Sequence, residues 1–344
     1  MSNSLFSLAF GVGTQNRQGN WLEVFYAQPL LRPAGELVDA VVPLLNYQGG
    51  NQAITISTTQ AALLADAIKT IDPIQHALLT RLAESQRPLV VTLLAEDAAL
   101  TSTPEAYLKL HLISHRLVKP HGLNLTGIFP LLPNVAWTNQ GAVDLAELAE
   151  RQLEARLKGY LLEVVSVDKF PKMTDYVVPA GVRIADSARI RLGAYVGEGT
   201  TVMHEGFINF NAGTEGPGMI EGRISAGVFV GKGSDLGGSS STMGTLSGGG
   251  NIVISLGENC LLGANAGTGI PLGDRCTIEA GLYITAGTKV EVLDQNGKVA
   301  DTVKARDLAG QSDLLFRRNS VSGAVQCQTN KTAVALNEEL HKHN

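Results

Sequence analysis

The chain has 344 residues, of which 44% are hydrophobic and 17% are charged, and its formal net charge is −5 at pH 7. This length predicts two or three domains with enough apolar content to bury a core. The acidic balance excludes a generally basic surface, so nucleic acid is not expected as a partner. No run of about 18 apolar residues is present, so we expect no membrane association. The sequence also has no secretory n-region, and its three scattered cysteines favour reduced thiols, so we expect a cytoplasmic protein.

Residues 1–175 are predicted to form a separate α/β domain. Alternating and helical spacings of apolar residues indicate strands at Ser4–Val12, Trp21–Ala27, Ala53–Ser57 and Leu89–Leu94, and helices at Thr59–Thr70, Pro73–Ser85, Pro104–Leu117 and Val143–Lys158. Val164–Pro179 is interpreted as the connection to the next domain. His111 and His115 lie four positions apart on one predicted helix, where two imidazoles could hold a metal. The alternative, a partly buried surface pair, is favoured because no acidic or cysteine ligand stands nearby.

An aliphatic or small residue returns every six positions from Ile184 onward. The residues in phase are Ile184, Ile190, Val196, Val202 and Ile208, then Ile224, Val230 and Leu236, and then Ile254, Cys260, Ala266, Leu272, Ile278, Ile284 and Val290. This period fits neither a helix nor a plain strand, but it is typical of short strands and tight turns stacked coil upon coil. A flexible Gly-rich linker would not keep this register. We therefore predict a parallel β-helix over residues 176–293.

Two interruptions of the repeat are candidates for the functional site. Between Ile208 and Ile224 there are four positions more than two repeats, with the excess assigned to TEGPGMIEGR, and between Leu236 and Ile254 the run TMGTLSGGG replaces apolar residues. Both are expected to project as loops. Residues 294–344 are predicted to hold a hairpin at Asn296-Gly297, a basic segment and a polar tail ending in a short helix.

Several runs together resemble the tetrahydrodipicolinate N-succinyltransferases of the second type, which have a large N-terminal domain. They are VMHEGFINFNAGT (Val202–Thr214), IEGRISAG (Ile220–Gly227), MGTLSGGG (Met243–Gly250), LLGANAGTGIPLGD (Leu261–Asp274), IEAGLYITAGTKV (Ile278–Val290) and LLFRRNSVSGAV (Leu314–Val325). The resemblance implies a left-handed β-helix that assembles as a homotrimer. It also implies transfer of a succinyl group from succinyl-CoA to the amino group of L-2-amino-6-oxopimelate, in the diaminopimelate route to lysine.

The resemblance assigns roles to individual residues. Glu221 is the carboxylate that accepts the acyl group as a mixed anhydride, although a general base for direct attack by the amine, or a solvated loop carboxylate, remains an alternative. Arg223 resembles a succinyl-CoA contact. The CoA arm is expected to lie along small or polar corner positions, namely Gly238, Ser241, Ala264, Glu279, Ala280 and Gly287, each of which could also be only a repeat corner.

The same resemblance places the phosphates of CoA near a polar and basic group in the C-terminal part, which comprises Lys304, Arg317, Arg318, Asn319 and Ser320. An acidic protein must concentrate cations wherever it holds phosphates. Glu205 matches a position where the family can hold a magnesium ion near the trimer axis. Ala188 stands where related chains carry a second acidic residue, which weakens this metal assignment.

Four other functions compete with this interpretation. A γ-type carbonic anhydrase needs three histidines, and His204 is the only one in the coil. A sugar-nucleotide enzyme is disfavoured because the N-terminal region has no Gly-rich nucleotide loop. Another CoA-dependent acyltransferase, such as tetrahydrodipicolinate N-acetyltransferase, stays open, and Arg223 with the RRNS run favours the succinyl enzyme. A non-catalytic scaffold would have uninterrupted repeats and bland loops.

Overall fold

The computed structural model describes residues 4–244 and 252–329, which form two compact units. The first unit comprises Met1–Leu112, Gly122–Pro171 and Asp175–Val177. The second comprises Ile113–His121, Lys172–Thr174 and Val178–Asn344. A short piece of the N-terminal half therefore belongs to the second unit.

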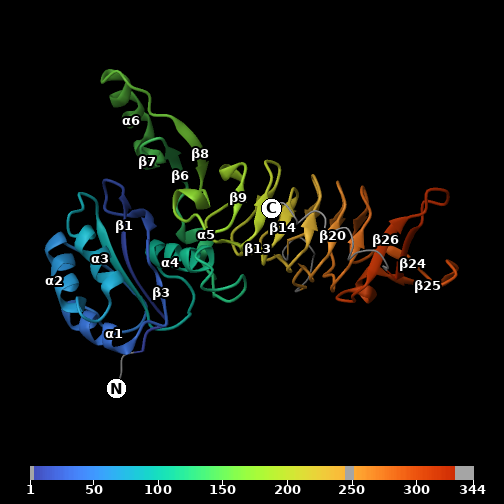
Figure 1. The fold of residues 1–344 in the computed structure, drawn as a ribbon. Coiled ribbons are helices and arrows are strands. Elements are labelled where there is room, and N and C mark those ends of the chain that lie inside the picture. Colours follow the sequence, from blue (N-terminus) through green and yellow to red (C-terminus); the bar gives the residue numbers. More distant parts are fainter. Residues whose placement is uncertain (1–3, 245–251, 330–344) are drawn as a thin grey trace. The chain divides into compact units, whose positions relative to one another are not determined.

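An antiparallel sheet with helices forms most of the first unit (Figure 1). Its strands run in the order β2-β1-β5-β4, with β3 also paired to β1. The strands are β1 (Ser7–Gln15), β2 (Trp21–Phe25), β3 (Leu30–Leu31), β4 (Gln52–Ile56) and β5 (Leu89–Leu94), and the helices are α1 (Gly35–Val41), α2 (Thr58–Ile68), α3 (Pro73–Leu82), α4 (Thr103–Ser114) and α5 (Ile128–Leu131), with a 3₁₀ turn at Val42–Leu44. All eight elements predicted for this half of the chain exist, counting α6 below, and their bounds differ from the prediction by a few residues.

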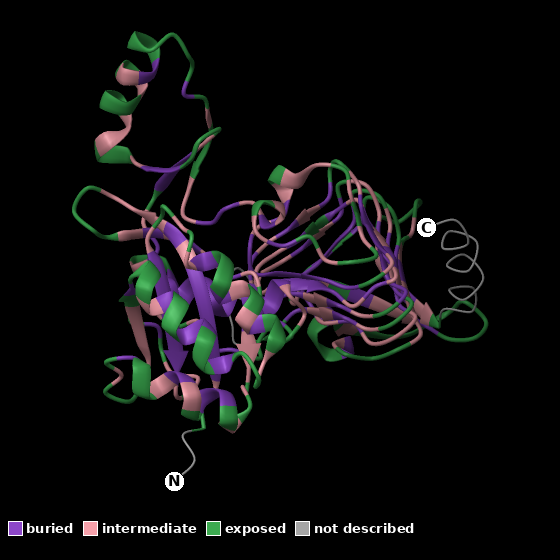
Figure 2. Cartoon of the chain, turned by 60° about the vertical axis from the view of Figure 1, so that its left-hand side comes forward, coloured by how far each residue is buried: buried purple, intermediate pink, exposed green. Residues whose placement is uncertain are grey.

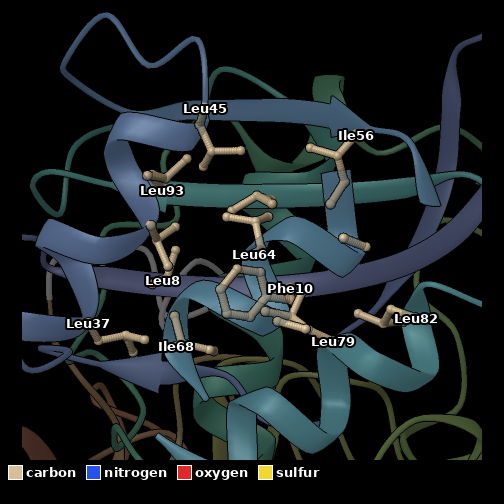
Figure 3. Packing of buried hydrophobic residues seen from close by; sticks show 14 of the residues in the cluster. Leu8, Phe10, Leu37, Leu45, Ile56, Leu64, Ile68, Leu79, Leu82 and Leu93 are labelled. Carbon is tan, nitrogen blue, oxygen red and sulfur yellow. The ribbon is translucent and has the colours of Figure 1, made fainter. Parts of the chain in front are cut away.

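The core of the first unit lies between the sheet and its helices, where buried side chains from both meet. Phe10 from β1 lies among Leu64 and Ile68 of α2 and Leu79 of α3, as Figure 3 shows. Two caps fix where these helices begin. Ser57 and Gln60 form a reciprocal capping box at α2, and the Asp72 carboxylate accepts the backbone N–H groups of Ile74 and Gln75 at α3.

A second, smaller sheet in the first unit was not expected. It has the order β7-β6-β8, with β6 (Val135–Thr138), β7 (Gly141–Asp144) and β8 (Val164–Asp168), and α6 (Leu145–Leu157) follows β7 directly. The interpretation of Val164–Pro179 as a connection was therefore wrong for its first five residues. β8 pairs with β6 across about 30 residues of chain, and such short strands carry no local signal of a distant partner.

The second unit is a coil with three faces, each a sheet of parallel strands (Figure 1). We call face 1 the sheet of β12 (Phe207–Ile208), β15 (Arg223–Ile224), β18 (Ser241–Thr242), β21 (Gly267–Thr268) and β23 (Tyr283–Ile284). Face 2 consists of β10 (Ala194–Val196), β13 (Ala212–Thr214), β16 (Phe229–Val230) and β19 (Ser255–Leu256). Face 3 contains β9 (Arg183–Ile184), β11 (Thr200–Val202), β14 (Gly218–Ile220), β17 (Asp235–Leu236), β20 (Leu261–Leu262), β22 (Thr277–Ile278) and β26 (Leu314–Arg318).

The interior of the coil is filled by one column of side chains for each face. On face 3, Val202, Ile220, Leu236, Leu262 and Ile278 lie in successive strands and are all buried. Figure 2 shows this buried interior along the length of the coil. The predicted parallel β-helix is confirmed.

The first interruption of the repeat is a shortened corner and not a projecting loop. Val196 pairs with Thr214 and Val202 with Ile220, eighteen residues on in each case, but Ile208 pairs with Ile224, only sixteen residues on. The chain thus completes three sides after Ile208, two of six residues and one of four, and the corner between Ile220 and Ile224 contains three residues where the next coil has five. A count of residues alone cannot separate an insertion of four into two sides from a deletion of two from three sides. The expectation of a loop in TEGPGMIEGR was wrong for this reason.

The second interruption is a true insertion, and the phase expected across it was wrong. Leu236 pairs with Leu262 and Val230 with Leu256, so the chain from Thr242 to Leu256 covers fourteen positions where six are usual. Residues 245–251 of this run lie outside the described residues. Ile254, Cys260 and Ala266 are buried as expected. The residues that pair with the preceding coil, however, come two positions later in each case, at Leu256, Leu262 and Thr268. A second shortened corner, between Thr268 and Leu272, restores the expected phase.

The C-terminal part contains the expected hairpin. β24 (Lys289–Leu293) and β25 (Val299–Lys304) are antiparallel, and the Asp294 carboxylate accepts the N–H groups of Asn296 and Lys298 in the turn. A 3₁₀ turn (Ala305–Leu308) then leads to β26, which continues face 3, and β27 (Val325–Thr329) returns antiparallel to it. The helix expected in the tail lies outside the described residues.

The segment Ile113–His121 packs on face 2 of the coil. Ser114 Oγ donates to the carbonyl of Ala194 and accepts the N–H of Gly193, and Arg116 Nε donates to the carbonyl of Val196 at 2.6 Å. His121 Nε2 lies 2.7 Å from the carbonyl oxygen of Gly227. These bonds cover backbone groups of the first coils.

The favoured interpretation expected His111 and His115 to be a partly buried surface pair. This was wrong for His111, which does not lie at the surface. It is fully buried, with Nδ1 2.8 Å from the Tyr107 carbonyl and Nε2 3.2 Å from the backbone nitrogen of Tyr26. Both ring nitrogens therefore have backbone partners in the core. Among the described residues, no group of three or more metal-binding side chains is found, and no helix is long and apolar enough to cross a membrane.

Candidate active site

One edge of the coil gathers six of the fourteen residues assigned from the sequence, namely Glu205, Glu221, Gly238, Ala264, Glu279 and Ala280. This edge consists of the turns that join face 3 to face 1, namely Met203–Gly206, Glu221–Gly222, Gly237–Ser240, Gly263–Ala266 and Glu279–Leu282, and we call it the corner column. Backbone hydrogen bonds stack these turns, with Ser239 N–H donating to Glu221, Asn265 N–H to Gly238 and Gly281 N–H to Ala264. Regular stacking makes the edge a rigid support for the side chains on it.

Glu221 lies on the shortened corner of this column. Its backbone N–H donates to the Leu236 carbonyl at 2.8 Å, which fixes the corner against the next coil. Gly222 leaves no room for a side chain, because a Cβ there would lie 2.6 Å from the Ser240 carbonyl oxygen. The corner between Ile220 and Ile224 is two residues shorter than the equivalent corner of the next coil, and Glu221 is half-buried on it.

Gly238 leaves open space next to the Glu221 carboxylate. Among the described residues, and apart from the chain neighbours of Gly238, the only heavy atom within 4 Å of the point where a Cβ would stand on Gly238 is Glu221 Oε2, at 3.5 Å. The structure thus brings together two residues that were assigned separately, the expected catalytic carboxylate and an expected CoA contact. A reacting group could approach the carboxylate over Gly238.

Arg223 and Ser241 also lie together, on the outer side of face 1. They are register partners in β15 and β18, and the Arg223 guanidinium donates from Nη2 to Ser241 Oγ at 2.6 Å and from Nε at 3.2 Å. Arg223 is exposed, so the remaining N–H groups of its fork are accessible to a ligand. Because Arg223 is two residues from Glu221, a carboxylate bound by this guanidinium would lie near the corner that holds Glu221.

The remaining corner positions continue the line toward the C-terminal end. Ala264 and Ala280 occupy the position equivalent to Gly238 in the next two coils, as the stacked hydrogen bonds show. The Glu279 carboxylate accepts the backbone N–H of Arg318 at 2.7 Å. Glu279 therefore fastens the corner column to the end of β26, and its charge is already engaged by the chain itself.

Four residues of the polar and basic group lie at the end of β26, where Arg317 and Arg318 complete the strand and Asn319 and Ser320 begin the turn after it. Arg317 Nη2 donates to Gln326 Oε1 at 3.4 Å, and Gln326 donates in turn to Glu291. Asn319 Oδ1 accepts the N–H groups of Val321 and Ser322, so its side chain shapes the turn. Arg318 and Ser320 are exposed beside it.

Gly287 and Lys304 lie next to each other at a different edge of the coil, beyond face 1. Ala305 N–H donates to the Thr288 carbonyl at 2.8 Å, and Lys304 is the register partner of Lys289. Both Gly287 and Lys304 are exposed. The assigned residues therefore lie in four places, namely the corner column, the outer side of face 1, the end of β26 with the turn after it, and this second edge.

Glu205 lies in the corner column one coil before Glu221. Its Oε2 accepts the Ser239 hydroxyl at 3.4 Å, and its backbone carbonyl accepts Nη2 of Arg189 at 2.8 Å. The carboxylate is exposed, and His204 Nε2 lies 3.8 Å from Oε1. One chain thus supplies a single carboxylate here, so a hard cation would need ligands from further copies.

Two residues of this region were missed in the sequence. Ser239 contacts the two preceding coils, through the backbone of Glu221 and the carboxylate of Glu205. Tyr283 places its ring over Gly267 on face 1, where a Cβ on Gly267 would lie 2.2 Å from Tyr283 Cε2, and Tyr283 is 41% exposed. The available signal was an aromatic residue at an outward position of the repeat, opposite a glycine one coil away.

Three family models match consecutive parts of the chain. The model described as the tetrahydrodipicolinate N-succinyltransferase N-terminal region matches residues 53–130, and the one described as its middle region matches residues 132–172. A model for the hexapeptide repeat of succinyltransferases matches residues 253–286.

Full-length relatives decide the family. A 2,3,4,5-tetrahydropyridine-2,6-dicarboxylate N-succinyltransferase from Pseudomonas putida is 80% identical over 344 residues, covering 100% of both chains. The protein of the same name from Vibrio cholerae is 62% identical over 98% of this chain and 99% of its own. This chain belongs to the tetrahydrodipicolinate N-succinyltransferase family. The acyltransferase class expected for this family member is confirmed.

A solved structure agrees with this membership. The chain described as a 2,3,4,5-tetrahydropyridine-2-carboxylate N-succinyltransferase from Campylobacter jejuni is 30% identical and superimposes with a TM-score of 0.88, over 96% of this chain and 93% of its own. The expected fold class, an α/β domain followed by a left-handed parallel β-helix and a short C-terminal extension, is confirmed. The boundaries at 175/176 and 293/294 stay predictions.

Proposed function

We propose that this family member transfers the succinyl group of succinyl-CoA to the amino group of L-2-amino-6-oxopimelate, the open form of tetrahydrodipicolinate. The products are N-succinyl-2-amino-6-oxopimelate and CoA, within diaminopimelate and lysine synthesis. The single observation that carries the site assignment is the half-buried Glu221 carboxylate on the shortened corner, next to the space over Gly238. The names of the full-length relatives support the reaction.

The chemistry at Glu221 can follow two routes. In the first, a carboxylate oxygen attacks the thioester carbonyl, the C–S bond breaks and CoA leaves as a thiolate; the amine then attacks the mixed anhydride and releases Glu221. In the second, the amine attacks the thioester directly, Glu221 takes the proton that the nitrogen must lose, and the C–S bond breaks so that CoA leaves. In both routes one amide bond forms, one thioester bond breaks, and the proton lost by the nitrogen ends on the CoA thiolate, so Glu221 returns to its starting carboxylate.

Arg223 is proposed to bind the free carboxylate of the succinyl group. A guanidinium can hold a carboxylate with two parallel hydrogen bonds, and the contact with Ser241 keeps the fork oriented on face 1. An acetyl group has no carboxylate for this contact. The proposal therefore favours succinyl-CoA over acetyl-CoA, and the N-acetyltransferase alternative predicts the opposite preference.

The CoA arm is proposed to run along the corner column toward the C-terminal turn. Gly238, Ala264 and Ala280 would leave space for the pantetheine, and Tyr283 offers an exposed ring on the adjoining face. Arg317 and Arg318, with Asn319 and Ser320, would hold the phosphates. Gly287 and Lys304 would contact CoA only if its far end crosses face 1.

Release of CoA thiol tests the reaction. The purified protein is mixed with succinyl-CoA and L-2-amino-6-oxopimelate, and the free thiol is measured over time. Glu221→Gln should lower the amine-dependent rate by about 10²- to 10⁴-fold, since it removes both the nucleophile and the base. Failure of the wild-type protein to release thiol with either succinyl-CoA or acetyl-CoA would favour the scaffold.

Mass spectrometry of the protein separates the two routes. Incubation with succinyl-CoA alone should add one succinyl group to the wild type by the anhydride route and none by the general-base route. Arg223→Gln is the matched test of donor choice: the preference for succinyl-CoA over acetyl-CoA should fall by about tenfold or more, while acetyl-CoA turnover changes little. Loss of both activities in equal measure would remove Arg223 from donor selection.

We further propose that the protein is a cytoplasmic homotrimer in which Glu205 of three copies can bind a magnesium ion. Three carboxylates suit a hard cation, and the exposed Glu205 side chain supports this role. Sedimentation analysis tests the trimer. A rise in melting temperature with magnesium that disappears in Glu205→Gln would support the ion, whereas an equal rise in both proteins would not.

A further inference from the structure

A cavity of about 220 Å³ lies within the first unit. One side is formed by Thr14 of β1 and by Arg87, which precedes β5. The other side is formed by the hairpin of β6 and β7 and by the last part of α6, including Arg151, Glu154 and Lys158, with Tyr160 just beyond it. None of these residues has a role in the proposed reaction.

The lining of this cavity is strongly cationic. It contains Arg87, Arg151 and Lys158 and a single carboxylate, Glu154, so the formal charge of its ionised side chains is +2. The whole chain is acidic, with a net charge of −5. Three cations that converge on one small cavity repel one another, and a bound anion would relieve this repulsion.

Two of the cations are held in place by other contacts. Arg87 Nη1 donates to Thr14 Oγ1 at 2.9 Å, and this hydroxyl donates in turn to Glu23 Oε1 at 2.6 Å. Arg151 Nη2 lies 3.8 Å from the carboxylate of Glu147, one turn earlier on α6. Both guanidinium groups keep further N–H groups for a ligand.

The two sides of the cavity are also tied together. Asn16 Nδ2 donates to the Asp144 carboxylate at 2.8 Å, and the N–H of Arg17 donates to Glu147 Oε1 at 2.7 Å. These bonds join the turn after β1 to the first turn of α6. The distance between Arg87 on one side and Lys158 on the other is therefore constrained, and the cavity is preorganised for a ligand.

We propose that this cavity is a binding site for a small dianion with oxygen acceptors, either a phosphate group or a short dicarboxylate. The three cations supply charge and forked donors, and the Tyr160 and Thr14 hydroxyls add polar contacts. The volume fits a compact anion and is too small for a nucleotide. The site is independent of the proposed reaction.

Isothermal titration calorimetry of the full-length protein with inorganic phosphate, and separately with malonate, tests this site. The double variant Arg151→Gln/Lys158→Gln should weaken binding by about tenfold or more. Arg156→Gln is the matched control, because Arg156 is exposed on the same helix but does not line the cavity. It should bind like the wild type.

A variant that adds to the site makes the test independent of folding losses. Glu154→Gln removes the only carboxylate of the lining and should tighten binding severalfold, with the effect reduced at high salt. Binding of phosphate alone or of malonate alone would identify the ligand class, and either would uphold the site. No binding of either anion at millimolar concentration, equal weakening by Arg156→Gln, or unchanged affinity in both lining variants would overturn the proposal.

Discussion

The first unit and the coil bury their apolar side chains in different ways. In the first unit, Phe10 is surrounded by residues from helices far away in the chain, so each contact depends on the complete fold. In the coil, each inward residue stacks on its equivalent in the next coil, as Ile220 does on Leu236. The first arrangement is cooperative over the whole unit, whereas the second is a sum of neighbouring terms. A substitution should therefore spread widely in one unit and stay local in the other.

The largest expected effect is on the core of the first unit. Phe10→Ala removes a fully buried ring and should lower the free energy of unfolding by about 3–5 kcal/mol. Segment-resolved hydrogen exchange should show lost protection throughout β1, α2 and α3, with the coil strands unchanged. Equal loss in face 3 would contradict the distinction between the units.

The next largest loss of stability is expected at a buried ion pair in the same unit. Lys109 is 0% exposed and donates to Asp97 at 2.5 Å and to the carbonyls of Ala98 and Asn124. Lys109→Met leaves a carboxylate that is only 26% exposed without its cation, and should cost about 3 kcal/mol. Chemical denaturation measures this cost. The double variant Lys109→Met/Asp97→Leu should recover part of it, and no recovery would show that the carbonyl contacts dominate.

The coil can be tested at two glycines that differ in their surroundings. Gly222→Ala would press a Cβ against Ser240 in the next coil and should cost about 2–3 kcal/mol, together with most of the activity of Glu221. Gly281→Ala meets nothing within 4 Å but has a φ of +74°, and should cost about 1 kcal/mol. Hydrogen exchange should show the Gly222 effect only in the adjoining coils. Loss of protection in every coil would mean that the coil unfolds as one unit.

The smallest effect concerns pH. Burial raises the pKa of the Glu23 carboxyl above its ordinary value, although hydrogen bonds from Thr14 and Tyr176 oppose this. The native state therefore binds this proton more tightly than the unfolded state, and stability is lost as pH rises from about 4.3 through the raised value. Glu23→Gln should remove this decline in denaturation curves measured from pH 4 to pH 7. A variant that loses stability in parallel with the wild type would assign the decline to other groups.

The sequence predicted the coil well because its signal is repeated many times. Each strand adds another inward residue in register, so local uncertainty averages out. The sequence could not show how many sides of the coil lie between Ile208 and Ile224, because this number depends on which strands pair. The same limit hid β8, whose partner β6 is distant in sequence, and the burial of His111, which is decided by Tyr26 and Tyr107 around it.

The candidate site was found through the family resemblance more than through chemistry. Glu221, Gly238, Arg223 and Ser241 were named singly, and only the register of the coils brings them into two contacting pairs. Tyr283 lay in one of the quoted runs and Ser239 between two of them, but their importance depends on neighbours one or two coils away. Motifs thus identified the residue types, while stacking determined which of them meet.

The shortened corner at Glu221 makes the length of the chain, as much as its chemistry, a condition for function. Elsewhere the coil accepts extra residues, since the chain from Thr242 to Leu256 carries many more than a regular side. Two residues inserted between Ile220 and Ile224 would give this corner the same length as that of the next coil, with every existing side chain preserved, and yet shift the carboxylate away from Gly238. In the evolution of such coils, a small insertion at one corner could therefore silence an active site that no substitution has touched, and a small deletion could create the place for one.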